Sequence, residues 1–292
     1  MQETEQLLEK YETAFEKMPK CPENWDVSAL KTEDNLKKIF SFIDLTTLNT
    51  TDSANSVQDF CDKLVSFERD YPDIPMVGAV CVYPVFASVL KARLKNLDVN
   101  RAVVSAGFPS SQTYLDLKVL ETKKALDFGA NEIDIVISVG EFLEGNHEFV
   151  MEEIKRIKSE MGDVHLKVIL ETGALSSVEN IWEASVIAME AGADFIKTST
   201  GKMSPAATPE AVWVMVHAIK AYHETTGKVI GLKPAGGIST SEDALIYFKI
   251  VKDILGEEWL TSEHFRIGAS RLANNLLNDI AELQGKPFSP YF

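Results

Sequence analysis

Two lysines in neighbouring strand-like segments carry the clearest signal of chemistry in this sequence. Lys197 stands in ADFIKTS and Lys233 in KVIGLKP, at comparable depths in the two segments. Burial and a nearby like charge both disfavour the protonated form of an amine, so the pair predicts a lysine whose amine is free near neutral pH. A free amine is the nucleophile that forms a Schiff base with an aldehyde or ketone. Asp134, in EIDIVIS, is the predicted group for proton transfer.

Four more ionisable residues in strand-like segments are candidates, because a charge there is costly unless it is paired or functional. Asp44 ends the first segment, and Glu132 lies two residues before Asp134. Lys167 and Glu171 share one face of the fifth segment. For any one of them, a buried structural ion pair is the alternative to a functional role. We expect them to lie at the carboxyl ends of strands and to converge on one pocket.

Eight short apolar segments, most of them followed by a helix-like stretch, must position these residues. Each is rich in Val, Ile or Phe and has the length of a buried parallel strand. Eight such units predict a closed (β/α)8 barrel. An open doubly wound sheet is the rival architecture, but no dinucleotide-type glycine fingerprint follows the first strand. The segments are IFSFIDL (39–45), MVGAVCV (76–82), RAVVSAG (101–107), EIDIVIS (132–138), HLKVILE (165–171), ADFIKTS (193–199), KVIGLKP (228–234) and HFRIGAS (264–270).

Small residues follow the last two strands. Gly236 and Gly237 come after the seventh strand, and Ser270 ends the eighth segment in Gly-Ala-Ser. In a barrel of this kind, the loops after strands seven and eight commonly bind phosphate through backbone amides and a helix N-terminus. Lys202, in STGK, could add a cation. The glycines could instead only form tight turns, yet two such loops after the appropriate strands favour a phosphate site.

Composition excludes several classes of protein. The chain has 292 residues, 29 Lys and Arg against 44 Asp and Glu, and a net charge of −15. This acidity argues against nucleic acid and anionic membrane surfaces as partners. Three cysteines without a C-x-x-C pair predict no disulfide framework, and they favour a reducing compartment, which we take to be the cytoplasm. The five histidines lack metal-ligand spacing, so no metal site is expected.

The chain divides into three parts in this interpretation. Residues 1–38 form a helical extension, with one helix over 6–18 and a second short one beginning near Thr32. Residues 39–283 form the barrel, and 284–292 form a tail. The acidic, amphipathic start is unlike a signal or transit peptide. We expect the extension to pack on the outside of the barrel.

Taken together, several motifs resemble deoxyribose-phosphate aldolase in its longer form. The resemblance covers about residues 39–283 with the motifs in the expected order. The combination of the two lysine motifs is highly specific. The motifs are DLTTL (44–48), VCVYP (80–84), EIDIVI (132–137), LKVILETG (166–173), FIKTSTGK (195–202), LKPAGGI (232–238) and IGAS (267–270).

The resemblance implies a class I aldolase on a TIM barrel, with no metal and no organic cofactor. Its reaction would be reversible cleavage of 2-deoxy-D-ribose 5-phosphate to acetaldehyde and D-glyceraldehyde 3-phosphate. Lys197 matches the Schiff-base lysine, Lys233 the lysine that depresses its pKa, and Asp134 the acid that acts through a bound water. The other matched positions surround the substrate hydroxyls and that water, or the phosphate: Asp44, Thr46 and Lys167, and then Thr200, Gly201, Lys202, Gly236, Gly237 and Ser270.

Three further expectations follow from the resemblance. The family is often dimeric, which implies a homodimer. Arg271 stands where many members have a small polar residue, and it either adds charge to the phosphate site or points outward. Tyr291 is a candidate for the tail tyrosine that dips into the site in some members. Two alternatives stay open: another Schiff-base aldolase, such as a transaldolase or keto-acid aldolase, and a non-catalytic barrel.

Overall fold

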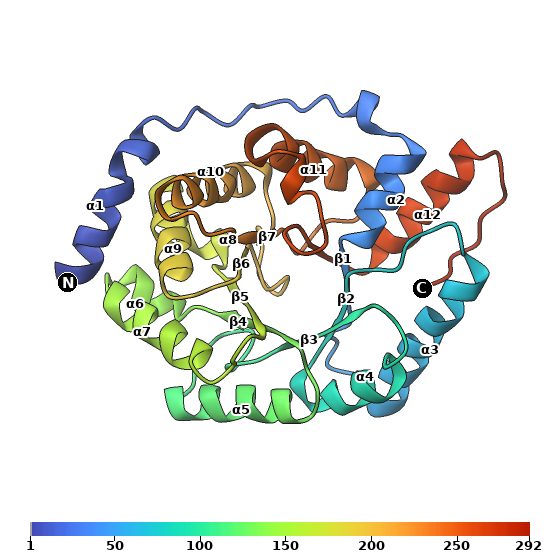
Figure 1. The fold of residues 1–292 in the computed structure, drawn as a ribbon, viewed down its shortest axis with the longest axis horizontal. Coiled ribbons are helices and arrows are strands. Elements are labelled where there is room, and N and C mark those ends of the chain that lie inside the picture. The colour runs from blue at the N-terminus through green and yellow to red at the C-terminus, as the bar shows by residue number, and fades with distance from the viewer. Residues whose placement is uncertain (1) are drawn as a thin grey trace.

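Eight parallel strands form the centre of the molecule in the computed structural model, which describes residues 2–292 (Figure 1). The strands pair in the order β7-β6-β5-β4-β3-β2-β1-β8. Parallel bridges join Leu232 to Phe265 and Ala235 to Gly268, so that β7 meets β8 and the sheet closes. The predicted TIM barrel is therefore confirmed. The strands are β1 (Ile43–Thr46), β2 (Ala79–Val82), β3 (Asn100–Val104), β4 (Glu132–Val136), β5 (His165–Ile169), β6 (Phe195–Lys197), β7 (Gly231–Lys233) and β8 (Ile267–Ala269).

Helices surround the strands, and several begin at side-chain caps. Thr240 and Asp243 form a reciprocal capping box at the start of α11, and Thr208 caps α10. Within residues 2–292, no helix is both long and apolar enough to cross a membrane. The helices are α1 (Gln2–Glu16), α2 (Glu33–Ser41), α3 (Ala54–Asp70), α4 (Ala87–Arg93), α5 (Leu115–Asp127), α6 (Val139–Leu143), α7 (His147–Lys158), α8 (Thr172–Leu175), α9 (Val178–Glu190), α10 (Pro209–Thr226), α11 (Ser241–Leu255) and α12 (Arg271–Leu283), with short 3-10 turns η1 (Ser28–Leu30), η2 (Pro84–Phe86) and η3 (Glu257–Trp259).

The strands are shorter than the sequence segments, and the first segment was partly wrong. Residues 39–41 belong to α2, which Thr32 caps by accepting from the Asn35 amide. Ile39 and Phe40 are fully buried on the inner face of this helix. A short apolar run is compatible with a buried helix as well as a strand, which is why periodicity misplaced this boundary.

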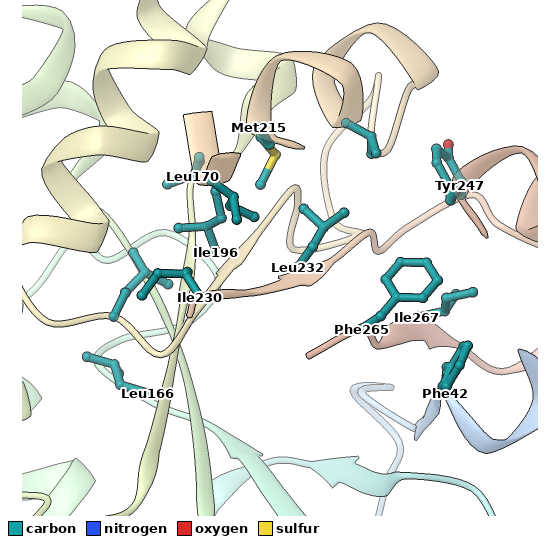
Figure 2. Packing of buried hydrophobic residues seen from close by; sticks show 14 of the residues in the cluster. Phe42, Leu166, Leu170, Ile196, Met215, Ile230, Leu232, Tyr247, Phe265 and Ile267 are labelled. Atoms are coloured by element: carbon teal, nitrogen blue, oxygen red, sulfur yellow. The ribbon is translucent and has the colours of Figure 1, made fainter. Parts of the chain in front are cut away.

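Alternation along the strands separates the outer apolar layer from the barrel interior. Ile196 and Leu232 lie with Met215 of α10 in one cluster between strands and helices (Figure 2). Successive residues of a strand point to opposite faces, so Lys197 and Lys233 point into the barrel. Elsewhere in the interior, a separate apolar cluster contains Leu48, Ala79, Cys81, Ala102 and Val104.

The N-terminal extension packs on the outside of the barrel, as expected. Tyr11 of α1 lies against Tyr222, with ring centroids 6.1 Å apart, and Phe15 lies 5.4 Å from Trp182. The connecting segment then runs across the top of the view in Figure 1 to α2. The expected boundary at residue 38 falls inside α2, which contacts α11 and α12. The division into three parts stays a prediction.

Candidate active site

A cavity of about 480 Å³ opens among the loops that follow β1, β6, β7 and β8. These loops leave the carboxyl ends of the strands, where barrel enzymes place their active sites. The pocket has both polar and apolar walls, and Phe60 and Ile238 supply apolar parts of it. Most of the sequence-predicted site residues line it, namely Thr46, Lys197, Thr200, Gly201, Lys202, Gly236, Gly237 and Ser270.

The three predicted catalytic residues meet at the inner end of this pocket. Lys197 and Lys233 are direct register partners on β6 and β7. Each Nζ lies 2.7 Å from Oδ2 of Asp134, which reaches across from β4. One carboxylate oxygen therefore bridges two amines whose side chains are almost fully buried. Lys197 lines the pocket, whereas Lys233 and Asp134 lie behind it.

The surroundings of the two lysines drive their pKa values in opposite directions. Burial lowers the pKa of Lys197, Asp134 opposes this, and the charge of Lys233 lowers it further. Burial also disfavours the charge of Lys233, but Asp134 and Asp44 outweigh it, and the pKa of Lys233 is raised. Burial opposes ionisation of Asp134, yet the nearby lysines hold its pKa well below the usual range. Lys197 is thus the better nucleophile of the pair.

Asp44 and Lys167 lie deeper than the pocket and do not line it. Asp44 Oδ2 is 2.5 Å from Lys233 Nζ. Burial by itself would raise the pKa of Asp44, but the positive charges of Lys233, Lys167 and Arg266 outweigh burial and lower this pKa. Lys167 hydrogen-bonds Glu132 and lies 3.6 Å from Asp134 Oδ1. The part of these two residues in substrate binding stays a prediction.

Glu132 does not lie at the carboxyl end of its strand, contrary to the expectation. It is the first residue of β4, and both of its oxygens accept from Arg266. Arg266 is fully buried and was not among the candidates. The sequence contained a signal for it, because HFRIGAS places an arginine between Phe265 and Ile267 in a strand-like segment.

The predicted phosphate loops form one wall of the pocket. Gly236 and Gly237 have φ values of +86° and +81°, a region that L side chains rarely adopt. A Cβ on Gly236 would lie 2.7 Å from the Ala206 Cβ and 3.0 Å from Gly201 Cα, so the loops after β6 and β7 are in close contact. Ser270 and Arg271, at the N-terminus of α12, complete this wall.

Two residues of this wall already have partners inside the protein. Lys202 Nζ donates to the Leu48 carbonyl, which joins the loop after β6 to the loop after β1. Thr200 donates to Glu171 from its amide, at 3.2 Å, and from its hydroxyl, at 2.5 Å. Phosphate contacts of Thr200, Lys202 and Arg271 stay predictions.

Glu171 has a different place from the one expected for it. It follows the end of β5 in the left-handed region, with φ +56°, and is 6% exposed. Its carboxylate faces Thr200 and not the lysines. In α8, which begins directly after Glu171, a Cβ on Gly173 would lie 2.0 Å from the Pro205 carbonyl oxygen, so this short helix packs directly against the loop after β6.

The structure places Tyr291 away from the pocket, contrary to its candidate role. Its hydroxyl donates to Asp70 Oδ2 at 2.9 Å, at the end of α3. The Asn274 side chain accepts from the amides of Tyr291 and Phe292 and donates to the Phe292 carbonyl. Helices of the barrel run back from the carboxyl ends of the strands, so the end of α3 lies at the opposite end of the barrel. The Tyr291 hydroxyl therefore reaches toward that end, whereas the backbone of Tyr291 and Phe292 is held by the first turn of α12.

Comparison with known proteins agrees with this geometry. A family model described as DeoC/LacD family aldolase matches residues 39–253. The deoxyribose-phosphate aldolase of Homo sapiens is 42% identical over 257 residues, which cover 84% of this chain and 80% of the human protein. That of Mus musculus is 41% identical over 256 residues, with the same coverage of 84% and 80%.

Solved structures extend the similarity to the fold. The deoxyribose phosphate aldolase from Aeropyrum pernix, described as a unique tetramer, superposes with a TM-score of 0.66 at 24% identity. The alignment covers 90% of this chain and 100% of that one. From the family match and the two mammalian relatives, together with a lysine pair held on one carboxylate, we conclude that this chain belongs to the DeoC/LacD family of aldolases.

Proposed function

We propose that this protein catalyses the reversible cleavage of 2-deoxy-D-ribose 5-phosphate to acetaldehyde and D-glyceraldehyde 3-phosphate, through a Schiff base on Lys197. The observation that carries the proposal is the position of Lys197. Among the described residues, it is the one member of the lysine–aspartate group that lines the pocket, and its pKa is lowered. Family membership and the mammalian relatives support the substrate.

The reaction begins with the neutral amine of Lys197. Its nitrogen attacks C1 of the open-chain aldehyde, and loss of water gives an iminium that can accept an electron pair. A base takes the proton of the C3 hydroxyl, the C2–C3 bond breaks, and its electrons form an enamine between C1 and C2. The C3 fragment leaves as D-glyceraldehyde 3-phosphate. Protonation of C2 and hydrolysis of the imine release acetaldehyde and restore Lys197.

Asp134 is the proposed proton carrier for these steps. Its Oδ2 touches both lysine amines, while its Oδ1 accepts no hydrogen bond from the described residues. That oxygen is available to hold the water through which the proton moves, as the family resemblance implies. Its low pKa keeps the carboxylate ionised between proton transfers.

The phosphate end of the substrate is proposed to bind at the wall made by Gly201, Gly236, Gly237 and Ser270. Backbone amides in glycine loops and the N-terminus of α12 favour an anion. Binding there orients the reacting carbons and can contribute several kcal/mol to the rate.

A product assay tests the proposal. Purified protein with 2-deoxyribose 5-phosphate should release acetaldehyde and D-glyceraldehyde 3-phosphate in equal amounts, with full activity after treatment with EDTA. Preference for a longer ketose donor or a keto acid over acetaldehyde in the synthetic direction would assign it to another lysine aldolase. No turnover with any of these substrates would favour a non-catalytic barrel.

Glu171→Gln should weaken use of the phosphorylated substrate. The carboxylate accepts two hydrogen bonds from Thr200, and hydrogen bonds to a charged group contribute about 1.5–3 kcal/mol. We expect KM for 2-deoxyribose 5-phosphate to rise about tenfold, with little change in kcat/KM for 2-deoxyribose itself. Glu179→Gln, at an exposed position, serves as the matched control. Equal losses for both sugars would mean that Glu171 supports the barrel in general.

We also propose a homodimer, with an exposed face of α5 as the contact. A groove of about 460 Å³ runs beside this helix. Antiparallel pairing of α5 with its copy would bring Asp116 near Lys124 of the second copy, both of which are exposed. Sedimentation should then give a mass of twice the 32.4 kDa of one chain. Leu117→Glu should lower this mass toward that of one chain, whereas the control Val229→Glu should leave it unchanged. A monomeric wild type would contradict this. The exposed apolar residues of the face are Val85, Tyr114, Leu117, Leu120 and Phe128.

For the compartment, we propose the cytoplasm. Cys21, Cys61 and Cys81 are all free, which suits a reducing environment. Cell fractionation tests this, and recovery of the protein with a secretory or organellar fraction would contradict it.

A further inference from the structure

Seven charged side chains fill the barrel interior beneath the pocket. Ion pairs within 4 Å link all seven into one connected set, because most members have two or more partners of opposite charge. Each residue is 4% exposed or less. Four are cations and three are carboxylates, so full ionisation would leave one uncompensated positive charge in a buried space. The cations are Lys167, Lys197, Lys233 and Arg266, and the carboxylates are Asp44, Glu132 and Asp134.

We infer that Arg266 is a positioning residue that keeps Lys197 neutral, by occupying carboxylates that would otherwise compensate a protonated Lys197. The inference rests on the proposed function of Lys197 and goes beyond it. Arg266 Nη1 lies 2.7 Å from Asp44 Oδ1, and its Nη2 lies 2.9 Å from Glu132 Oε1. The guanidinium cannot lose its proton in a protein, so the surplus must be removed at a lysine.

The contacts of the lysines decide which one loses its proton. Lys233 lies between two carboxylates, 2.7 Å from Asp134 and 2.5 Å from Asp44. Lys167 hydrogen-bonds Glu132 and lies within 4 Å of Asp44 and Asp134 as well.

Lys197, in contrast, touches one carboxylate oxygen, Asp134 Oδ2, and shares it with Lys233. It is the least compensated amine of the set, and it is also the one that lines the pocket. The surplus proton is therefore lost from Lys197 Nζ, the atom that must be neutral to attack the substrate aldehyde.

Other groups that face Lys197 do not change the balance. Cys81 on β2 is buried, and burial raises the pKa of its thiol to about 11, so it is neutral in the working range. The interior of β3 presents Ala102 and Val104, and the adjacent interior position on β8 is Gly268. The titratable neighbours of Lys197 are therefore Asp134, Lys233 and the thiol, with the remaining members of the set behind them.

Arg266→Met tests the inference. The variant leaves three cations and three carboxylates, so Lys197 can stay protonated without a surplus. We expect the acid limb of kcat/KM, and of the rate of borohydride trapping on Lys197, to move up by one pH unit or more. At pH 7 this is a loss of about tenfold or more, with recovery near pH 9–10. Circular dichroism and the melting temperature monitor the fold.

The second variant separates charge balance from simple damage. Arg266→Met with Glu132→Gln removes one charge of each sign, restores a surplus of one cation, and should return the acid limb toward that of the wild type. Glu132→Gln alone leaves a surplus of two and should move the limb to lower pH. If Arg266→Met does not fold, the pH profile of Glu132→Gln alone decides whether the charge balance sets the protonation of Lys197.

An unchanged pH profile in folded Arg266→Met would overturn the inference. So would a double variant, Arg266→Met with Glu132→Gln, whose acid limb is shifted as far as that of Arg266→Met alone. An unshifted Glu132→Gln would do the same. These outcomes differ from failure of the proposed function, because in that case the wild type itself would form no adduct on Lys197 and release no acetaldehyde.

Discussion

Lys197→Leu is expected to abolish covalent trapping by borohydride in the presence of 2-deoxyribose 5-phosphate, and to lower kcat by at least about 10⁴-fold. Without the amine, no iminium forms, and the C2–C3 bond has no electron sink. The fold should persist, because an apolar side chain replaces one that sheds its charge. Peptide mass spectrometry of the trapped wild type should locate the adduct on Lys197.

Lys202→Leu is the matched control for this experiment. Lys202 also lines the pocket, but its Nζ bonds the Leu48 carbonyl and lies outside the buried charged set. This variant should keep the adduct and change KM more than kcat. An adduct on Lys233 in the wild type would exchange the roles of the two lysines. No adduct from folded wild type would refute the Schiff-base mechanism for this substrate.

Lys233→Leu is expected to lower kcat/KM at pH 7 by about 10²-fold, with partial recovery at pH 9–10. Removal of its positive charge releases Asp134 and Asp44 to stabilise a protonated Lys197. The pKa of Lys197 therefore rises, and each unit by which it exceeds the pH reduces the free amine about tenfold. Because the neutral amine is the reactive form, activity returns as the pH rises through the new pKa.

Lys233→Arg separates the charge of this residue from its shape. Arginine keeps the positive charge between Asp44 and Asp134, so the pH profile should stay close to that of the wild type even if kcat falls. Full activity of Lys233→Leu at pH 7 would contradict the account in which Lys233 lowers the pKa of Lys197. Loss of activity at every pH, in both variants, would indicate a packing role.

The sequence by itself determined the barrel and which lysines and aspartate would meet inside it. Eight buried-strand segments separated by helical stretches left one economical architecture, and the order of strands in the structure confirms it. Lys197 and Lys233 were predicted at comparable depths in neighbouring strands, and their register on β6 and β7 confirms this. The depth of a residue in a strand is a local property, so each segment by itself was enough to infer it.

The ends of strands and helices, and the directions of side chains outside the regular strands, could not be inferred from local pattern in this way. Ile39 and Phe40 have the same apolar pattern in a buried helix as in a strand. Alternation along a strand would put Glu171 on the same face as Lys167, but its left-handed backbone conformation turns the side chain toward Thr200. Tyr291 lies in the tail, and only the hydrogen bonds of the tail to Asn274 decide where it lies.

Only the tertiary structure decided how the buried charges balance. Arg266 and Glu132 are separated by more than a hundred residues, yet closure of the sheet brings them into contact. The protonation of Lys197 depends on the sum of such contacts across the barrel, and the sequence spacing of any one residue contains no record of them. Local pattern thus fixes which face a side chain occupies, while barrel closure fixes which charges it meets and hence whether its amine is free to react.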